Sequence, residues 1–354
     1  MLIETTVLVL GAALLHAAWN TLVKTAADPL VSVGALSLVT AGPGLLLVLV
    51  APIPTLTALP YLAGSVVLHF GYYLFLVSAY RVGDLSHVYP ISRGSAPLLV
   101  ALGGIVIAQE QLPLLTLFGI AITSIGIMLL AISGANSKTR NHRSTPRALI
   151  TGCFIAAYTL VDGLGVREGG VALSYIGWLF LINGLVFGLF VFVRRPAEML
   201  SLWRNDTARV VGGGIAKAIA YGTVIFVMYY SPMAVVATLR ETSVIMAALI
   251  GVYFLREPAG QLRIAAALLV AGGIIAMNLS SLSRPATQPS LPETAPPPDG
   301  TLAGCLRRAA NSEYFSKIPS AECQAVSDYL TSRNSISKIR VSSGPIDPPA
   351  PALP

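Results

Sequence analysis

Five ionisable side chains lie deep inside apolar stretches of this sequence, where a charge is costly. They are Arg93, Asp162, Lys217, Arg240 and Glu241. A charged side chain at the centre of a bilayer costs about 2.5–3.5 kcal/mol on insertion scales, so such residues normally face a wet cavity or a partner. The chemistry that these residues offer is the binding of a charged group, a structural ion pair or the transfer of a proton.

The three deep cations outnumber the two deep carboxylates by one. For Arg93 and Arg240 the sequence predicts a substrate-facing or gating pair, with an internal ion pair or snorkelling as the alternatives. Lys217 suits proton coupling or a substrate contact, and its alternative is a fixed bridge to Asp162 or Glu241. If the internal pairing is complete, one cation remains for a carboxylate, phosphate or phosphonate group on a substrate.

Further polar residues lie four apart and therefore share a helix face. They form the pairs His16 with Asn20, His69 with Tyr73, Tyr158 with Asp162, and Lys217 with Tyr221. His16 can serve as a proton site near neutral pH or can simply bond a neighbouring backbone. The predicted substrate-binding or coupling residues are His16, Trp19, Asn20, His69, Tyr73, Arg93, Tyr158, Asp162, Lys217, Tyr221, Arg240 and Glu241.

The elements that position these residues follow from the composition. The chain has 354 residues, of which 55% are hydrophobic and 11% charged, and its mean hydropathy is +0.74. A soluble domain typically carries about 25% charged residues. The composition therefore predicts a polytopic membrane protein, and α-helices are expected because lipid demands internally satisfied backbone hydrogen bonds.

Ten apolar runs approach the roughly 20 residues that cross the hydrocarbon core. The predicted helices span residues 4–24, 30–51, 58–80, 86–108, 113–133, 148–167, 172–193, 209–230, 233–255 and 260–281. The first run lacks a basic leading segment, so we expect it to remain as a span rather than a cleaved signal.

The basic connection 137–147 divides the ten helices into five and five, which suggests a duplication. An offset of 147 residues places Arg93 on Arg240 and Glu110 on Glu257. Five helices per copy is an odd number, so the second copy is expected to be inverted, as in many secondary transporters. The predicted organisation is a first repeat over 1–136, the connection 137–147, a second repeat over 148–282 and a tail over 283–354.

The segments LLHAAWNTLVK, YPISRGSAP, AAYTLVDGLGVR and ATLRETSVIMAALIGVYFLREPAGQLRIAAALLVAGGIIAMNL resemble the EamA-domain branch of the drug/metabolite transporter superfamily. The resemblance covers residues 1–282. It implies an all-α fold of ten helices in two inverted repeats and the transport of small metabolites. It does not specify the substrate, and nothing from it carries over to the tail.

The leading hypothesis is a secondary transporter of a small polar metabolite in the inner membrane, working by alternating access. The expected partners are a small-molecule substrate and the lipid bilayer, with either proton coupling or uncoupled exchange. No nucleotide-binding loop, metal motif, cofactor motif or catalytic spacing is present, so neither an ATP-driven pump nor an enzyme is predicted. The alternatives are a non-transporting sensor or scaffold that acts through its tail, and a lipid-phosphate flippase of the same fold.

Basic residues in the loops predict the orientation, because cytoplasmic loops are enriched in Lys and Arg. The loops on one side of the membrane carry twelve Lys and Arg residues, and those on the other side have only Arg167. The connection 137–147 is therefore predicted to be cytoplasmic, and both termini are predicted to lie outside. No basic stretch is interleaved with aromatic residues, which excludes a nucleic-acid surface. The Pro-rich tail is predicted to be partly disordered, and Cys305 and Cys323 can pair there in an oxidising compartment. The loops of the predicted cytoplasmic side carry Lys24, Arg81, Lys138, Arg140, Arg143, Arg147, Arg194, Arg195, Arg204, Arg209, Arg256 and Arg263.

Overall fold

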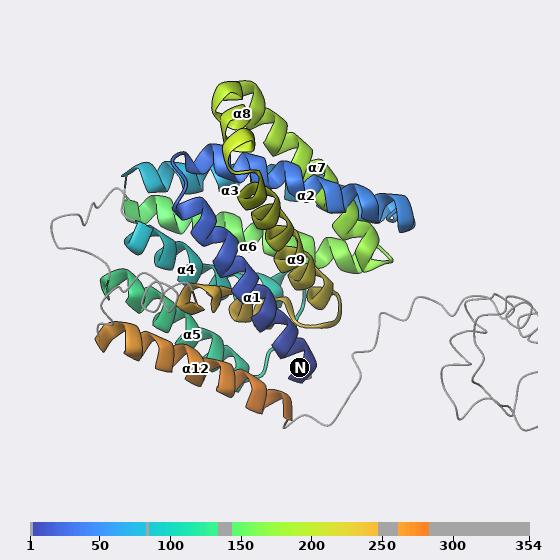
Figure 1. The fold of residues 1–354 in the computed structure, drawn as a ribbon. Helices are drawn as coiled ribbons and strands as arrows, with labels where there is room; N and C mark the ends of the chain where they lie inside the picture. Colours follow the sequence, from blue (N-terminus) through green and yellow to red (C-terminus); the bar gives the residue numbers. More distant parts are fainter. Residues whose placement is uncertain (1–2, 83–84, 134–143, 247–260, 283–354) are drawn as a thin grey trace, which may run out of the picture. The chain divides into compact units, whose positions relative to one another are not determined.

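The computed structural model describes residues 3–82, 85–133, 144–246 and 261–282 of the chain. Within these ranges every regular element is a helix (Figure 1). The predicted tail 283–354, Glu257, Cys305, Cys323 and most of the connection 137–147 lie outside the described residues. The all-helical fold class is therefore confirmed over the described part of the chain.

Each predicted apolar run contains a helix. The elements are α1 (Ile3–Lys24), α2 (Pro29–Val50), the 3₁₀ turn η1 (Leu56–Ala58), α3 (Leu59–Val82), α4 (Leu85–Val106), α5 (Leu114–Ser133), α6 (Ser144–Glu168), α7 (Ala172–Arg194), α8 (Pro196–Asn205), α9 (Thr207–Tyr230), α10 (Met233–Glu241) and α12 (Gln261–Leu282).

Eight helices among the described residues are long and apolar enough to cross a membrane: α1, α2, α3 with η1, α5, α6, α7, α9 and α12. Helix α4 has the length, but polar residues occupy its first half and two prolines, Pro90 and Pro97, lie inside it. Large apolar side chains such as Leu46, Leu49 and Val50 are exposed on the outside, as lipid-facing residues are. These features indicate a multi-pass membrane protein.

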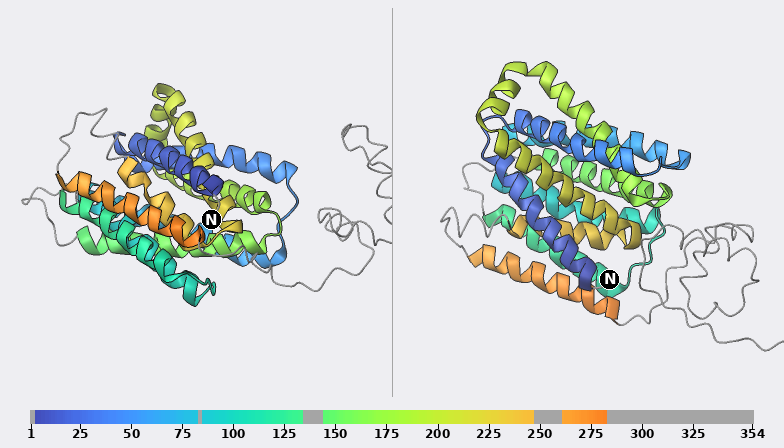
Figure 2. Two further views of the ribbon diagram at one scale, coloured as in Figure 1. Left: turned by 90° about the horizontal axis from the view of Figure 1, so that it is seen from below. Right: turned by 45° about the vertical axis from the view of Figure 1, so that its right-hand side comes forward.

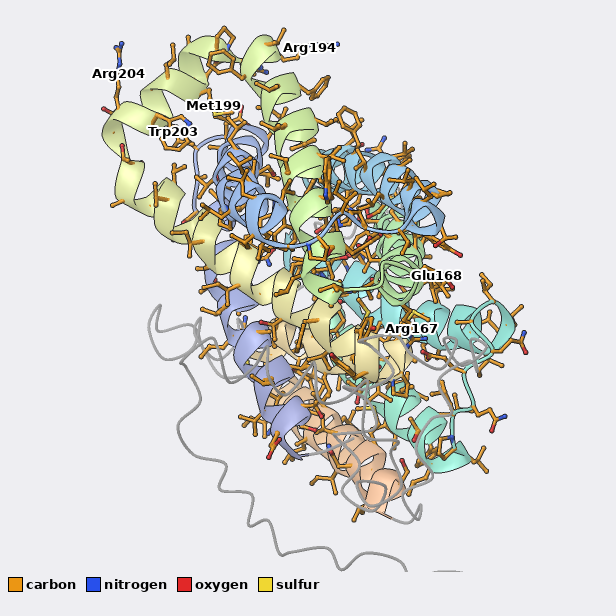
Figure 3. All side chains as sticks on the ribbon, turned by 90° about the vertical axis from the view of Figure 1, so that its right-hand side faces the viewer. Arg167, Glu168, Arg194, Met199, Trp203 and Arg204 are labelled. Carbon is orange, nitrogen blue, oxygen red and sulfur yellow. The ribbon has the colours of Figure 1, made fainter. Side chains whose placement is uncertain are left out.

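The sequence predicted a loop between residues 193 and 209, and this prediction was wrong. The structure places the ten-residue helix α8 there. Met199 is buried and Trp203 half-buried against the core, whereas Arg194 and Arg204 point outward (Figure 3). A short helix with one apolar face lacks the continuous apolar run that reveals a span, so a search for spans misses it.

The predicted span 233–255 is interrupted, because α10 ends at Glu241. The Thr242 backbone N–H bonds the Leu239 carbonyl at 3.2 Å, and the Thr242 hydroxyl donates to the same carbonyl at 2.6 Å. Such short-range bonds tighten the turn and compete with the helical pattern. Residues 243–246 are helical again, so the interruption falls beside two of the predicted charged residues.

Long-range packing follows a regular pattern. Helix α2 packs along α7 and α5 along α12, while α3 packs on α6 and α1 on α9. Figure 2 shows α5 and α12 side by side in both views. Glycines allow these close approaches, because they bring one backbone against another. An ideal Cβ on Gly44, for example, would lie 2.9 Å from the Phe180 Cβ.

Two adjacent glycines of α12 provide a direct test of this packing. A Cβ on Gly273 would collide with the Thr123 hydroxyl and lie 2.6 Å from the Gly119 carbonyl oxygen, whereas a Cβ on Gly272 meets nothing within 4 Å. We expect Gly273→Ala to lower the free energy of unfolding by about 1–3 kcal/mol, the usual cost of overpacking. Gly272→Ala should leave it unchanged or raise it by up to about 1 kcal/mol, since alanine favours helix.

The measurement is the midpoint of thermal unfolding of both variants in detergent. Equal midpoints for Gly273→Ala and Gly272→Ala would show that α5 and α12 do not pack through Gly273.

Candidate functional site

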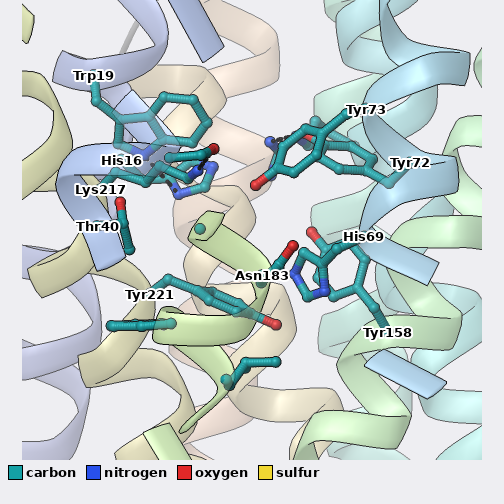
Figure 4. Close-up of a pocket in the computed structure, with 15 residues that line it drawn as sticks. His16, Trp19, Thr40, His69, Tyr72, Tyr73, Tyr158, Asn183, Lys217 and Tyr221 are labelled. Atoms are coloured by element: carbon teal, nitrogen blue, oxygen red, sulfur yellow. Dashed lines mark hydrogen bonds between the residues drawn. The ribbon is translucent and has the colours of Figure 1, made fainter. Parts of the chain in front are cut away.

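Seven helices surround a central cavity at mid-height of the bundle (Figure 4). The empty space between its walls amounts to about 580 Å³, open solvent at the mouth included. The side chains that line it are His16, Trp19, Ser37, Thr40, His69, Tyr72, Tyr73, Arg93, Tyr158, Leu179, Phe180, Asn183, Gly184, Lys217 and Tyr221.

The structure gathers most of the predicted site residues around this cavity. Four of the predicted residues do not line it: Asn20, Asp162, Arg240 and Glu241. Asn20 turns back on its own helix and donates to the His16 carbonyl at 2.7 Å. The other three lie behind residues that do line the cavity, and they hold those residues in place. The predicted residues that line the cavity are His16, Trp19, His69, Tyr73, Arg93, Tyr158, Lys217 and Tyr221.

Glu241 binds both of the predicted arginines. Arg93 Nη1 lies 3.2 Å from Glu241 Oε2, and Arg240 Nη2 lies 2.7 Å from Glu241 Oε1. Arg240 Nε also donates to Oε1 at 2.9 Å. The relative exposure of the three side chains is 1%, 1% and 0%. The internal ion pair, one of the two alternatives for the arginines, is thus the geometry that the structure shows.

One carboxylate does not satisfy both guanidinium groups. Arg93 Nε and Arg240 Nη1 are buried and have no hydrogen-bond partner among the described residues. Arg93 Nη2 reaches the Tyr72 hydroxyl at 3.3 Å at the cavity wall, and the Arg240 guanidinium lies 5.8 Å from the Tyr158 ring centroid. The cluster therefore supports the aromatic wall from behind.

Lys217 has no carboxylate within 4 Å among the described residues. Its Nζ donates to the Ser37 hydroxyl at 2.7 Å and lies 5.1 Å from the Tyr73 ring centroid. The fixed bridges to Asp162 or Glu241, which the sequence left as alternatives, are therefore not present. Lys217 is 9% exposed and directs an uncompensated ammonium at the cavity.

Asp162 is fully buried and is held by two phenols. Tyr175 donates to Asp162 Oδ1 at 3.0 Å, and Tyr221 donates to Oδ2. These bonds tie α6 to α7 and α9, and they fix the ring of Tyr221 at the cavity wall. Asp162 therefore acts on the cavity through Tyr221.

His16 presents a hydrogen-bond donor to the cavity. Its Nδ1 accepts the indole N–H of Trp19 at 3.3 Å. A neutral imidazole with Nδ1 as the acceptor carries its proton on Nε2. The Nε2 atom is buried and has no partner among the described residues, so its N–H is an unsatisfied donor in the cavity wall.

An aromatic wall faces Lys217 and His16 across the cavity (Figure 4). His69 stacks on Tyr158 with ring centroids 4.1 Å apart, and Tyr221 meets His69 edge-on at 5.5 Å. Tyr72 and Tyr73 continue the array. His69 Nδ1 bonds to the Ser65 carbonyl at 3.0 Å, which fixes the orientation of its ring.

The sequence missed Ser37 and Thr40 of α2 and Asn183 of α7. The apolar runs that form α2 and α7 carry no charge, so nothing in them indicated that their polar residues reach a binding site. Both hydroxyls donate to the carbonyl four residues back, at 2.8 and 2.9 Å. Asn183 was the stronger signal, because an amide in the middle of an apolar run needs a partner. It makes no hydrogen bond to a described residue in the structure.

A second polar cluster closes one end of the bundle. Arg167 Nη2 donates to Glu110 Oε1 at 2.9 Å and to the Ser231 carbonyl at 2.9 Å, and the Met233 N–H donates to Glu110 Oε1 at 2.8 Å. Glu110 follows α4, Arg167 ends α6, and the other two residues flank the connection between α9 and α10. This cluster joins the first half of the chain to the second.

Comparisons with known proteins agree with this architecture. Residues 147–279 match the sequence profile of the EamA-like transporter family. Among solved structures 27 chains match. One, titled only as the crystal structure of a protein, superposes with a TM-score of 0.64 at 17% identity and covers 80% of this chain and 100% of its own. That identity shows a shared fold alone. No curated protein matches the chain in sequence.

Proposed function

We propose that this protein, whose residues 147–279 match the EamA-like transporter family, is a secondary transporter that moves a small anionic metabolite across the inner membrane. The observation that carries the proposal is Lys217, a buried cation that lines the cavity and has no carboxylate partner among the described residues. A group of this kind inside a membrane normally marks a substrate or ion pathway. The metabolite supplies the missing negative charge.

The proposed architecture is two inverted five-helix repeats. In such a duplication each helix corresponds to the helix five spans later. Two pairs of corresponding helices pack on each other, α2 with α7 and α5 with α12. In the same scheme α3 corresponds to α9 and α6 to α1, and the contact of α3 with α6 has its counterpart in the contact of α9 with α1. This exchange of partners is what a twofold axis between the halves would produce, and it supports the proposal together with the alignment of Arg93 and Arg240.

Alternating access assigns a role to the cluster of Glu110 and Arg167. Because this cluster ties the two halves together at one end, it has to separate when the cavity opens at that end and re-form when the cavity opens at the other. Arg194 in the last turn of α7 and Arg204 in the last turn of α8 lie at the opposite end (Figure 3). We assign that end to the cytoplasm.

The test is counterflow in proteoliposomes that contain the purified full-length chain. Vesicles loaded with one unlabelled carboxylate, phosphate or phosphonate metabolite at a time are mixed with trace labelled compound outside. We expect vesicles with the protein to accumulate at least one labelled anion. They should accumulate neither the matched amines nor the neutral amides, and protein-free vesicles should accumulate none of these compounds. Accumulation of amines alone would contradict an anionic substrate.

The two alternative functions give different outcomes in the same vesicles. A scaffold that acts through its tail shows no counterflow of any compound, and deletion of residues 285–354 abolishes its partner binding, whereas a transporter lacking these residues keeps its flux. A lipid-phosphate flippase moves a labelled phospholipid between leaflets and leaves soluble anions where they are.

A further inference from the structure

We propose that the transported anion carries a flat ring, with its acidic group at Lys217 and His16 and its ring against the aromatic wall. The inference rests on the proposed function and names the substrate class of the same cavity. Two features of the cavity carry it: a side that offers only unmatched donors, and a facing side built from aromatic rings.

The donor side lacks a counter-charge. Lys217 has spent one N–H on Ser37, and the Nε2–H of His16 has no partner among the described residues. Asn183 lies between the two sides with its amide unused (Figure 4). No carboxylate of the described part of the chain lines the cavity. An ammonium and a buried imidazole N–H without an acceptor are costly unless a ligand supplies oxygens, and a carboxylate supplies two.

The rings on the aromatic side of the cavity contact one another directly. His69 and Tyr158 stack with an interplanar angle of 26°, and Tyr221 lies at 85° to Tyr158 with centroids 6.0 Å apart. The bond from Tyr221 to Asp162 and the Arg240 guanidinium beside Tyr158 hold these rings from behind. These contacts hold the rings of Tyr158 and Tyr221 in place at the cavity wall.

A flat ring extends such an array. Aromatic rings attract one another in offset or edge-to-face arrangements with centroids about 4.5–7 Å apart, and most ring pairs of this wall have that spacing. An aliphatic group of the same size gains the burial but not the ring-to-ring attraction. The cavity should therefore distinguish a ring-bearing acid both from a saturated acid and from a neutral ring.

The test compares four probes on the full-length protein by isothermal titration calorimetry: benzoate, cyclohexanecarboxylate, benzamide and acetate. We expect benzoate to bind about threefold to tenfold tighter than cyclohexanecarboxylate, from the ring contacts. It should bind about tenfold to a hundredfold tighter than benzamide, from the charged hydrogen bonds. Acetate should bind more weakly than either carboxylate that bears a six-membered ring.

A variant pair assigns the ring preference to the wall. In the wild type, the cyclohexanecarboxylate dissociation constant should exceed that of benzoate. Tyr158→Leu should reduce this ratio to about one, because the ring contribution is lost. Phe118→Leu, on the outward face of α5 with 61% exposure, should keep the wild-type ratio. A ratio of two constants measured on one preparation does not depend on the fraction of protein that has folded.

The outcomes separate this inference from the proposed function. Equal binding of benzoate and cyclohexanecarboxylate, both tighter than benzamide, overturns the ring and leaves the anion transporter standing. Benzamide binding as tightly as benzoate overturns the placement of the acid at Lys217. Absence of benzoate binding in a protein that shows anion counterflow also overturns the ring, whereas absence of counterflow for every anion contradicts the proposed function itself.

Discussion

Replacing Glu241 by glutamine is expected to lower the free energy of unfolding by about 3–5 kcal/mol, the usual cost of removing one partner from a buried ion pair. The substitution leaves two guanidinium groups, Arg93 and Arg240, facing each other without a counter-charge in a region from which solvent is excluded. The measurement is the shift of the unfolding midpoint, relative to the wild type, on heating and in a titration with a denaturing detergent.

The control is a pair of the same chemistry at the surface. Arg195 and Glu198 lie 3.0 Å apart and are well exposed, so solvent already screens their attraction. Glu198→Gln should not shift the midpoint measurably. Comparable shifts for Glu241→Gln and Glu198→Gln would mean that the buried cluster does not support the fold.

The cluster also predicts an order among its members. Arg93→Leu leaves a neutral pair, because Arg240 keeps its two short contacts with Glu241. This change should therefore destabilise the protein less than Glu241→Gln does. The reverse order would show that Glu241 is not the shared counter-charge of both arginines.

Replacing Lys217 by methionine is expected to slow anion flux strongly and to leave the protein at least as stable. Hydrogen bonds to charged groups contribute about 1.5–3 kcal/mol each, so losing the ammonium should slow uptake by roughly tenfold to a hundredfold or more at a fixed, low substrate concentration. Stability should hold or rise, because methionine matches the length of the lysine stem and removes a buried charge that no protein group compensates. Flux in vesicles and the unfolding midpoint are measured on one preparation.

The matched control is Ile219→Met, two residues further along α9 and 52% exposed to the exterior. It should keep both flux and midpoint. Retained flux in Lys217→Met would remove Lys217 from substrate binding. A lowered midpoint would instead assign Lys217 a structural role through Ser37.

The fold could largely be predicted from the sequence because lipid imposes a simple rule. A helix that crosses a membrane has to be apolar over its whole length, so the positions of α1, α2, α3, α5, α6, α7, α9 and α12 can be read as uninterrupted apolar runs. The same rule cannot find α8, whose apolar residues cover only one face. It also cannot find the interruption at Thr242, because a local competition between hydrogen bonds leaves hydropathy unchanged.

The site was only partly predictable, for a related reason. Charged and aromatic residues in apolar runs are visible as exceptions, and spacing by four places them on one face. Which charges meet depends on the packing of helices distant in the sequence, and no pattern along the chain shows that Glu241 serves both arginines while Lys217 has none. Serine and threonine bond their own helix in most surroundings, so Ser37 gave no signal.

The proposed duplication would be broken at its most charged point. Gly94 occupies the position in the first repeat that Glu241 occupies in the second, at the offset that aligns Arg93 with Arg240. A Cβ on Gly94 would lie 2.6 Å from Met128 Cγ and 3.0 Å from the Ser124 carbonyl oxygen. The packing of α4 on α5 therefore leaves no room for a second carboxylate, and the two arginines have to share one.

The unmatched Lys217 has an electrical consequence for a carrier of this kind. The formal charges of Arg93, Arg240, Lys217, Asp162 and Glu241, in and behind the cavity wall, sum to one positive charge without substrate and to none with a bound monovalent anion. A potential of 100 mV acts on one elementary charge with about 2.3 kcal/mol. The loaded carrier would thus change sides electroneutrally, and the membrane potential would act on the return of the empty one.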